Sequence, residues 1–146
     1  MALAFGVLLL IFLPLERAFP AHRQSIFRKE WGTDLLFFAG QYLLWTVPVV
    51  SILGFLYMNA NALPLGWARE FVAKQPLWIQ IPAIILISDL CVYWFHRWSH
   101  RNPFLWRIHR VHHTAEKLDW LAAHREHPID NLLTRFVENL PLILLG

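Results

Sequence analysis

The chain has 146 residues, of which 57% are apolar and only 16% are charged. Soluble domains contain roughly 45–50% apolar residues, and the charges here are clustered, so long stretches of this chain cannot form a soluble surface. The single cysteine, Cys91, excludes an internal disulfide, and the formal net charge is +3 with the eight histidines neutral. This composition predicts an all-α protein with several membrane-spanning helices.

The first apolar segment, residues 2–15, falls short of the ~20 residues that a membrane-spanning helix needs, and Pro14 lies near its end. It fits a short or tilted span. A secretory signal peptide is the alternative, but no basic residue precedes the apolar run and no clear small-residue cleavage pattern follows it. Residues 16–33 are polar and basic, so we expect them to lie outside the hydrocarbon.

Two longer apolar segments follow, at residues 34–58 and 77–95, and the length of each suits one membrane crossing. The connection between them, residues 59–76, contains turn-forming Asn, Pro and Gly residues and only two cations. Residues 132–146 become apolar again and predict a fourth span. Because the chain stops inside this run, we expect residues 1–146 to be one membrane domain that is incomplete at its C-terminus.

Cations are unevenly distributed among the three connections. Residues 16–33 hold four, residues 59–76 hold two and residues 96–130 hold six. Because cytoplasmic loops are enriched in Lys and Arg, we predict an integral membrane protein whose first and third connections, including its histidine-rich block, are cytoplasmic. These basic loops could bind an acidic electron carrier or anionic lipid headgroups. No nucleic acid partner is expected.

The histidines are clustered, because seven of the eight fall within 32 positions at the end of the second long apolar segment. They form three groups: His96 and His100; His109, His112 and His113; His124 and His127. Spacings of three and four gather side chains on one face of a helix, so the rings of the first two groups could share metal ions. The alternative is a basic interfacial segment in which the histidines have no metal role.

The residue types leave the metal open, because imidazole suits iron, zinc, copper or nickel. Arg97 stands where a zinc-protease motif has glutamate, and the lone cysteine makes structural zinc a weak fit. Asp89 lies seven residues before His96, on roughly the same helical face, with Tyr93 between them. We predict that Asp89 orients a ligand histidine by accepting its second ring proton. The alternative is a helix-pairing acid without a metal role.

The segments HRWSH, HRVHH and AAHREHPID lie within residues 89–130, the histidine-box region, and resemble the fatty acid hydroxylase/sterol desaturase superfamily. The short distance between the first two boxes favours this superfamily over acyl-CoA desaturases. The upstream segments ERAFP and WGTD are similar to it as well.

The resemblance implies an enzyme that uses O2 and two iron ions to hydroxylate or desaturate a lipid, with zinc able to replace iron in the isolated protein. The metal ligands that it implies are His96, His100, His109, His112, His113, His127 and His124. Family members carry a further histidine cluster downstream, so we expect residues 1–146 alone to be inactive. A transporter or a non-catalytic metal-binding protein is the alternative, but transporters place polar ligands near mid-membrane, whereas these histidines lie at one edge.

Overall fold

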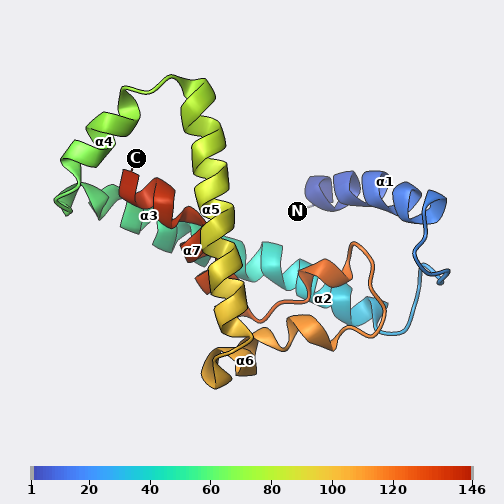
Figure 1. Ribbon diagram of the computed structural model, residues 1–146. Helices are drawn as coiled ribbons and strands as arrows, with labels where there is room; N and C mark the ends of the chain where they lie inside the picture. Colours follow the sequence, from blue (N-terminus) through green and yellow to red (C-terminus); the bar gives the residue numbers. More distant parts are fainter. Residues whose placement is uncertain (1, 146) are drawn as a thin grey trace.

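The computed structural model describes residues 2–145, and all regular secondary structure in that range is helical. Figure 1 shows the helices, which in chain order are α1 (Ala2–Ala18), α2 (Trp31–Gly40), η1 (Gln41–Trp45), α3 (Thr46–Asn59), η2 (Ala60–Ala62), α4 (Gly66–Ala73), α5 (Leu77–Ser99), α6 (Pro103–His109), η3 (His112–Thr114), η4 (Ala122–His124) and α7 (Pro128–Leu145). The predicted all-α class is therefore confirmed. The helices α2, η1 and α3 follow one another without a break and form one long helix, in which η1 is a π-helical segment.

Two helices in the described range are long and apolar enough to cross a membrane: Trp31–Asn59, with 29 residues, and α5, with 23. They match the predicted segments 34–58 and 77–95, but the first begins three residues earlier and the second ends four residues later. Large apolar side chains along α5 are exposed, as Leu86 is at 69%. Contact with lipid would cover such a surface.

In the part of the chain that the structure describes, the other two predicted spans, residues 2–15 and 132–146, do not form helices that are long and apolar enough to meet the same criterion. Helix α1 has 17 residues, and α7 begins at Pro128, before the predicted segment 132–146, with three charged residues along its length. A membrane crossing by α1 or α7 therefore stays a prediction. The connection 59–76, with its turn-forming residues, also contains the eight-residue helix α4, which is too short to show a clear helical period in the sequence.

Helices α3, α4, α5 and α6 pack around α7. Figure 1 shows α5 crossing the long α2–η1–α3 helix, with α7 packed against α5 and α3 and with α6 below the C-terminal end of α5. A small apolar core lies beside α2, where Phe38 and Leu121 are fully buried. The Phe5 ring of α1 packs on Phe38 and on Trp120, with ring centroids 5.2 and 5.5 Å apart. The core thus joins the start of the chain to the histidine-box region.

The first and third connections contact each other directly. The Gln24 side chain donates to the Leu118 carbonyl oxygen at 2.8 Å, and Arg28 forms an ion pair with Asp119. These contacts bring the two basic connections together, and their location on one side of a membrane stays a prediction. The compartment on that side stays a prediction as well.

Helix α6 begins with a side-chain cap that the sequence explains. Oδ1 of Asn102 accepts hydrogen bonds from the backbone N–H groups of Phe104 and Leu105, and Pro103 occupies the first helical turn. We expect Asn102→Ala to lower the free energy of unfolding by about 1 kcal/mol, because these donors lose their acceptor. Denaturant titration of the purified protein would measure the loss. Asn102→Ser keeps an acceptor and should lose much less; equal losses would contradict a capping role.

Candidate metal centre

Four histidines converge at the C-terminal end of α5. His96 and His100, on α5 and at its C-cap, meet His109 from α6 and His113 from η3, and the four potential ligand nitrogens all lie within 4.8 Å of one another. The Nε2 atoms of His96 and His100 are 3.1 Å apart, and those of His109 and His113 are 3.2 Å apart. Such distances allow two nitrogens to share one ion at about 2.1 Å.

Local structure explains this convergence. Helix α5 continues past its apolar part to Ser99, so His96 and His100 are one turn apart on the same face, as predicted. The chain then reverses, and α6 brings the His109 ring to 4.6 Å from that of His96. The prediction that His109 and the two histidines after it share one helical face is wrong, because α6 ends at His109 and a separate 3-10 turn carries His113.

A carboxylate fixes the orientation of His109. Nδ1 of His109 lies 2.8 Å from Oδ2 of Asp130, and both side chains are about 95% buried. Since Nδ1–H donates to the carboxylate, the lone pair of His109 is on Nε2, which faces the other histidines. This is the usual arrangement of a metal-binding histidine. The acid comes from the first turn of α7, so α7 helps to build the centre.

We expect Asp130→Asn to weaken metal binding about 10–100-fold, because His109 loses the acceptor that sets its tautomer. Titration of the metal-free protein with Fe²⁺ or Co²⁺ would measure the affinity. Glu138→Gln, on the same helix and outside the centre, should keep the wild-type value. Wild-type affinity in Asp130→Asn would exclude an orienting role for Asp130.

The residues predicted to support the ligands lie elsewhere. Asp89 is exposed and lines a cavity between the helices, and its side chain makes no hydrogen bond with another residue of the described chain. Tyr93 is also exposed, and its hydroxyl accepts a hydrogen bond from Arg97 at 3.1 Å. Within residues 2–145, the contact predicted for Asp89 is made by Asp130 instead.

The other three predicted ligands lie outside the group of four. Nδ1 of His112 is buried without a hydrogen-bond partner among the described residues, and its ring centroid is 6.0 Å from that of His109. His124 contacts Gln41, with Nδ1 3.0 Å from Oε1, and its ring packs edge-on against Phe38. Nδ1 of His127 accepts a hydrogen bond from a backbone N–H in the first turn of α7. Metal binding by these three stays a prediction.

The surroundings of His113 and His124 favour the neutral form of each imidazole. Burial lowers the pKa of His113, and the neighbouring histidines, of which His112 contributes most, lower it further. Burial also lowers the pKa of His124. Neutral imidazole is the form that binds metal. The donor set therefore fits a transition metal: it has four converging imidazoles, one of them oriented by an acid, and a buried nitrogen on His112 without a hydrogen-bond partner among the described residues.

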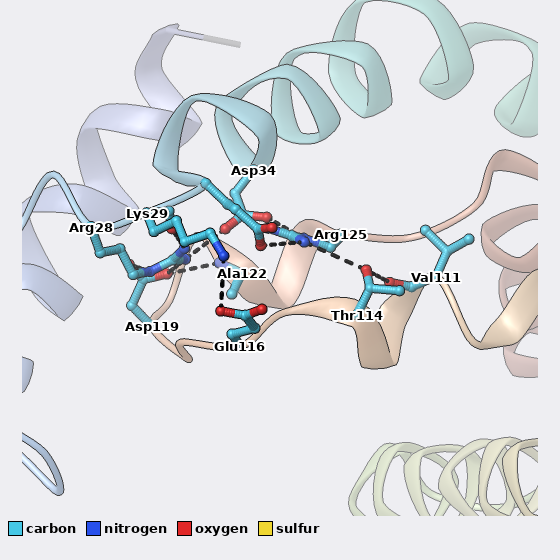
Figure 2. A network of polar contacts seen from close by, with 10 residues as sticks. Arg28, Lys29, Asp34, Val111, Thr114, Glu116, Asp119, Ala122 and Arg125 are labelled. Atoms are coloured by element: carbon cyan, nitrogen blue, oxygen red, sulfur yellow. Dashed lines mark hydrogen bonds and ion pairs between the residues drawn. The ribbon is translucent and has the colours of Figure 1, made fainter.

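A buried ion network holds the histidine-bearing loop against the start of α2 (Figure 2). The Asp34 carboxylate, fully buried, accepts hydrogen bonds from Arg28 and from Arg125. Arg28 also donates to both oxygens of Asp119, at 2.8 and 2.6 Å, and Arg125 donates to Glu30 at 2.9 Å. Two arginines and three acids thus join segments that are about 90 positions apart in the sequence.

The network is close to two histidine segments. Arg125 directly follows His124, and its Nη1 lies 3.5 Å from the hydroxyl oxygen of Thr114, which directly follows His113. The pKa of Arg125 is raised, chiefly by its hydrogen bond to Asp34. Arg125 therefore stays protonated although it is buried. Its ion pairs can then hold the segments that carry His113 and His124 in place.

Sequence reasoning missed several of these residues. Asp130 was only the end of a polar block, and Asp34 only the last charge before an apolar segment. The signal for Asp34 was a carboxylate at the start of an otherwise apolar helix, where it needs a partner. Asp130 also lies in the first turn of its helix, but α7 carries two further charged residues, so its signal was weaker. Trp106, whose ring centroid is 5.3 Å from that of His100 and 5.6 Å from that of His113, gave no signal beyond its size.

The part of the chain that forms this candidate metal centre is similar to known proteins. A family model described as fatty acid hydroxylase matches residues 81–146, which include all four converging histidines. The chain is 35% identical over 99 residues to a Delta(7)-sterol 5(6)-desaturase of Gibberella zeae, covering 65% of this chain and 27% of that protein. It is 28% identical over 123 residues to the lathosterol oxidase of Mus musculus, covering 79% and 38%.

The name of a bacterial relative refers to an ornithine lipid instead of a sterol. The chain is 34% identical over 83 residues to the ornithine lipid hydroxylase of Rhizobium tropici, covering 56% of this chain and 25% of that protein. The chain thus spans between a quarter and two fifths of the length of these three curated relatives. No solved structure matches it. The histidine boxes, the family match over residues 81–146 and these relatives show that the chain is similar to the fatty acid hydroxylase/sterol desaturase superfamily.

Proposed function

We propose that this chain forms the histidine-box part of a membrane enzyme that uses O2 to hydroxylate or desaturate a lipid at a centre of two iron ions. The observation that carries the proposal is the convergence of four histidines within 4.8 Å at the end of a candidate membrane span. The relatives support it, because their names describe sterol desaturation, lathosterol oxidation and lipid hydroxylation.

The four converging histidines would hold one ion. His112, with its buried and unpartnered Nδ1, is the nearest further donor and would serve the second ion together with His124 and His127. When bound, the iron supplies the O2 chemistry needed to attack an unactivated C–H bond. The chain's own residues orient the imidazoles, and Asp130 does so for His109 through Nδ1. Zinc would occupy the same nitrogens without supporting oxidation, since it has no redox chemistry.

The location of the centre suits a lipid substrate. The centre lies where an apolar helix meets a basic loop, so a hydrocarbon could reach it from the bilayer while electrons arrive from water. We propose that this side is cytoplasmic. The exposed cations of the third connection would then attract an acidic electron carrier by charge complementarity.

The test is to express the protein from its complete gene, measure its iron content and supply lipids under O2. Iron-containing protein that forms hydroxylated or unsaturated lipid, and does so only with O2, would support the proposal. Protein that binds metal without oxidising any lipid would instead support a non-catalytic metal-binding protein or a transporter. Metal-free protein would contradict both functions.

A further inference from the structure

A cavity of about 610 Å³ lies between the two candidate membrane spans and α7. Its volume falls within the ~300–1,000 Å³ of typical ligand sites. Apolar side chains from all three helices line it: Val49, Val50, Leu53, Ile84, Ile85 and Leu142. The cavity therefore has room and a suitable lining for an apolar molecule that enters from the bilayer.

The polar side chains of the cavity include one carboxylate without a partner. Arg135 and Glu138 form an ion pair at 2.7 Å, so their charges offset each other. Asp89 and Ser88 line the cavity from α5, and the side chain of Asp89 makes no hydrogen bond within the described chain. A carboxylate near the middle of a membrane helix is costly unless it has a partner. The cavity is therefore formally anionic and needs a hydrogen-bond donor beside Asp89.

We propose that this cavity binds a lipid alcohol, whose hydroxyl group donates a hydrogen bond to Asp89 while its hydrocarbon lies against the apolar walls. A hydroxyl supplies the donor that Asp89 lacks and brings no charge. A fatty acid anion supplies no donor and is repelled by the same carboxylate. This role for Asp89 replaces the orientation of a histidine, which Asp130 performs.

The inference rests on the proposed function in one respect, namely that the bound alcohol is the molecule to be oxidised. Asp89 precedes His96 by seven residues, which corresponds to about 10 Å along α5. The apolar side chains that α5 gives to the cavity, Ile84 and Ile85, precede Asp89, so the hydrocarbon extends away from the histidines and the hydroxyl end of the lipid lies nearest to them. Asp89 then sets which carbon lies at the centre.

Binding of two lipids with the same 16-carbon chain tests the inference. Hexadecan-1-ol carries a hydroxyl and palmitate a carboxylate, and each would be titrated at pH 8 into the metal-free protein in phosphatidylcholine nanodiscs. We expect the protein to bind hexadecan-1-ol about tenfold more tightly or better, the effect of one hydrogen bond to a charged group. Equal affinities, or tighter binding of palmitate, would overturn the inference without any variant being made.

Variants of Asp89 test its role. Asp89→Leu should bind hexadecan-1-ol about tenfold more weakly, and Asp89→Asn should bind palmitate more tightly than the wild type does, because the repelling charge is gone. Glu116→Gln, which removes an exposed carboxylate outside the cavity, should change neither affinity. If folded Asp89 variants bind both lipids as the wild type does, Asp89 is not the site of recognition.

These binding measurements need neither iron nor O2, so the two proposals can fail separately. Lipid oxidation together with equal binding of the alcohol and the acid would contradict only the lipid alcohol site. Selective binding of the alcohol, lost in Asp89→Leu, by a protein that never oxidises lipid would contradict only the proposed function.

Discussion

Replacing His109 by alanine is expected to abolish metal binding and, with it, lipid oxidation. His109 is the most buried of the four converging histidines, at 5% exposure, and its ring contacts those of the other three. It also holds the Asp130 carboxylate at 2.8 Å, so the substitution leaves a buried acid without its donor. The loss of metal affinity should exceed the ~10–100-fold expected for Asp130→Asn.

Metal content after purification and metal titration both measure this effect. His22→Ala is the matched control, because it removes the same kind of side chain from a loop outside the metal centre and should keep full metal content. Circular dichroism would show whether His109→Ala remains helical. A folded His109→Ala protein with wild-type metal content would show that the four rings converge for another reason.

Replacing Asp34 by alanine should have the largest effect on stability. Asp34 is fully buried and accepts hydrogen bonds from two arginines whose side chains are 3% and 4% exposed. Its loss leaves two buried cations with fewer acceptors, and removal of one member of a buried ion network typically costs about 3–5 kcal/mol. The same change frees the loop that carries His113 and His124, so metal affinity should fall as well.

The neighbouring pair of Lys29 and Glu116 provides the control (Figure 2). It joins the same two connections at 3.2 Å, but its side chains are 71% and 65% exposed. Exposed ion pairs contribute about 0–1 kcal/mol, so Glu116→Ala should unfold close to the wild type in a denaturant titration. If Asp34→Ala and Glu116→Ala lowered the free energy of unfolding by similar amounts, the buried Asp34 network would stabilise the protein no more than an exposed ion pair does.

The sequence by itself determined the all-α class, the two candidate spans and the first pair of histidines. Each follows from a local period: apolar runs of membrane length give the spans, and a spacing of four places His96 and His100 one turn apart. The histidine boxes also indicated the similarity to the superfamily, because their residues and spacing are specific. The lengths of the apolar runs and the helical repeat were sufficient to predict the spans and the first pair of histidines.

Only the tertiary structure decided which side chains complete the centre. Asp130 reaches His109 across 21 positions, and Asp34 reaches Arg125 across 91. Such pairs depend on how α7 and the 111–127 loop pack, and no local pattern encodes that packing. Sequence reasoning therefore placed the orienting acid on the same helix as its histidine, whereas the chain brings it from another helix. A buried imidazole is oriented by whichever carboxylate the fold brings within hydrogen-bond distance.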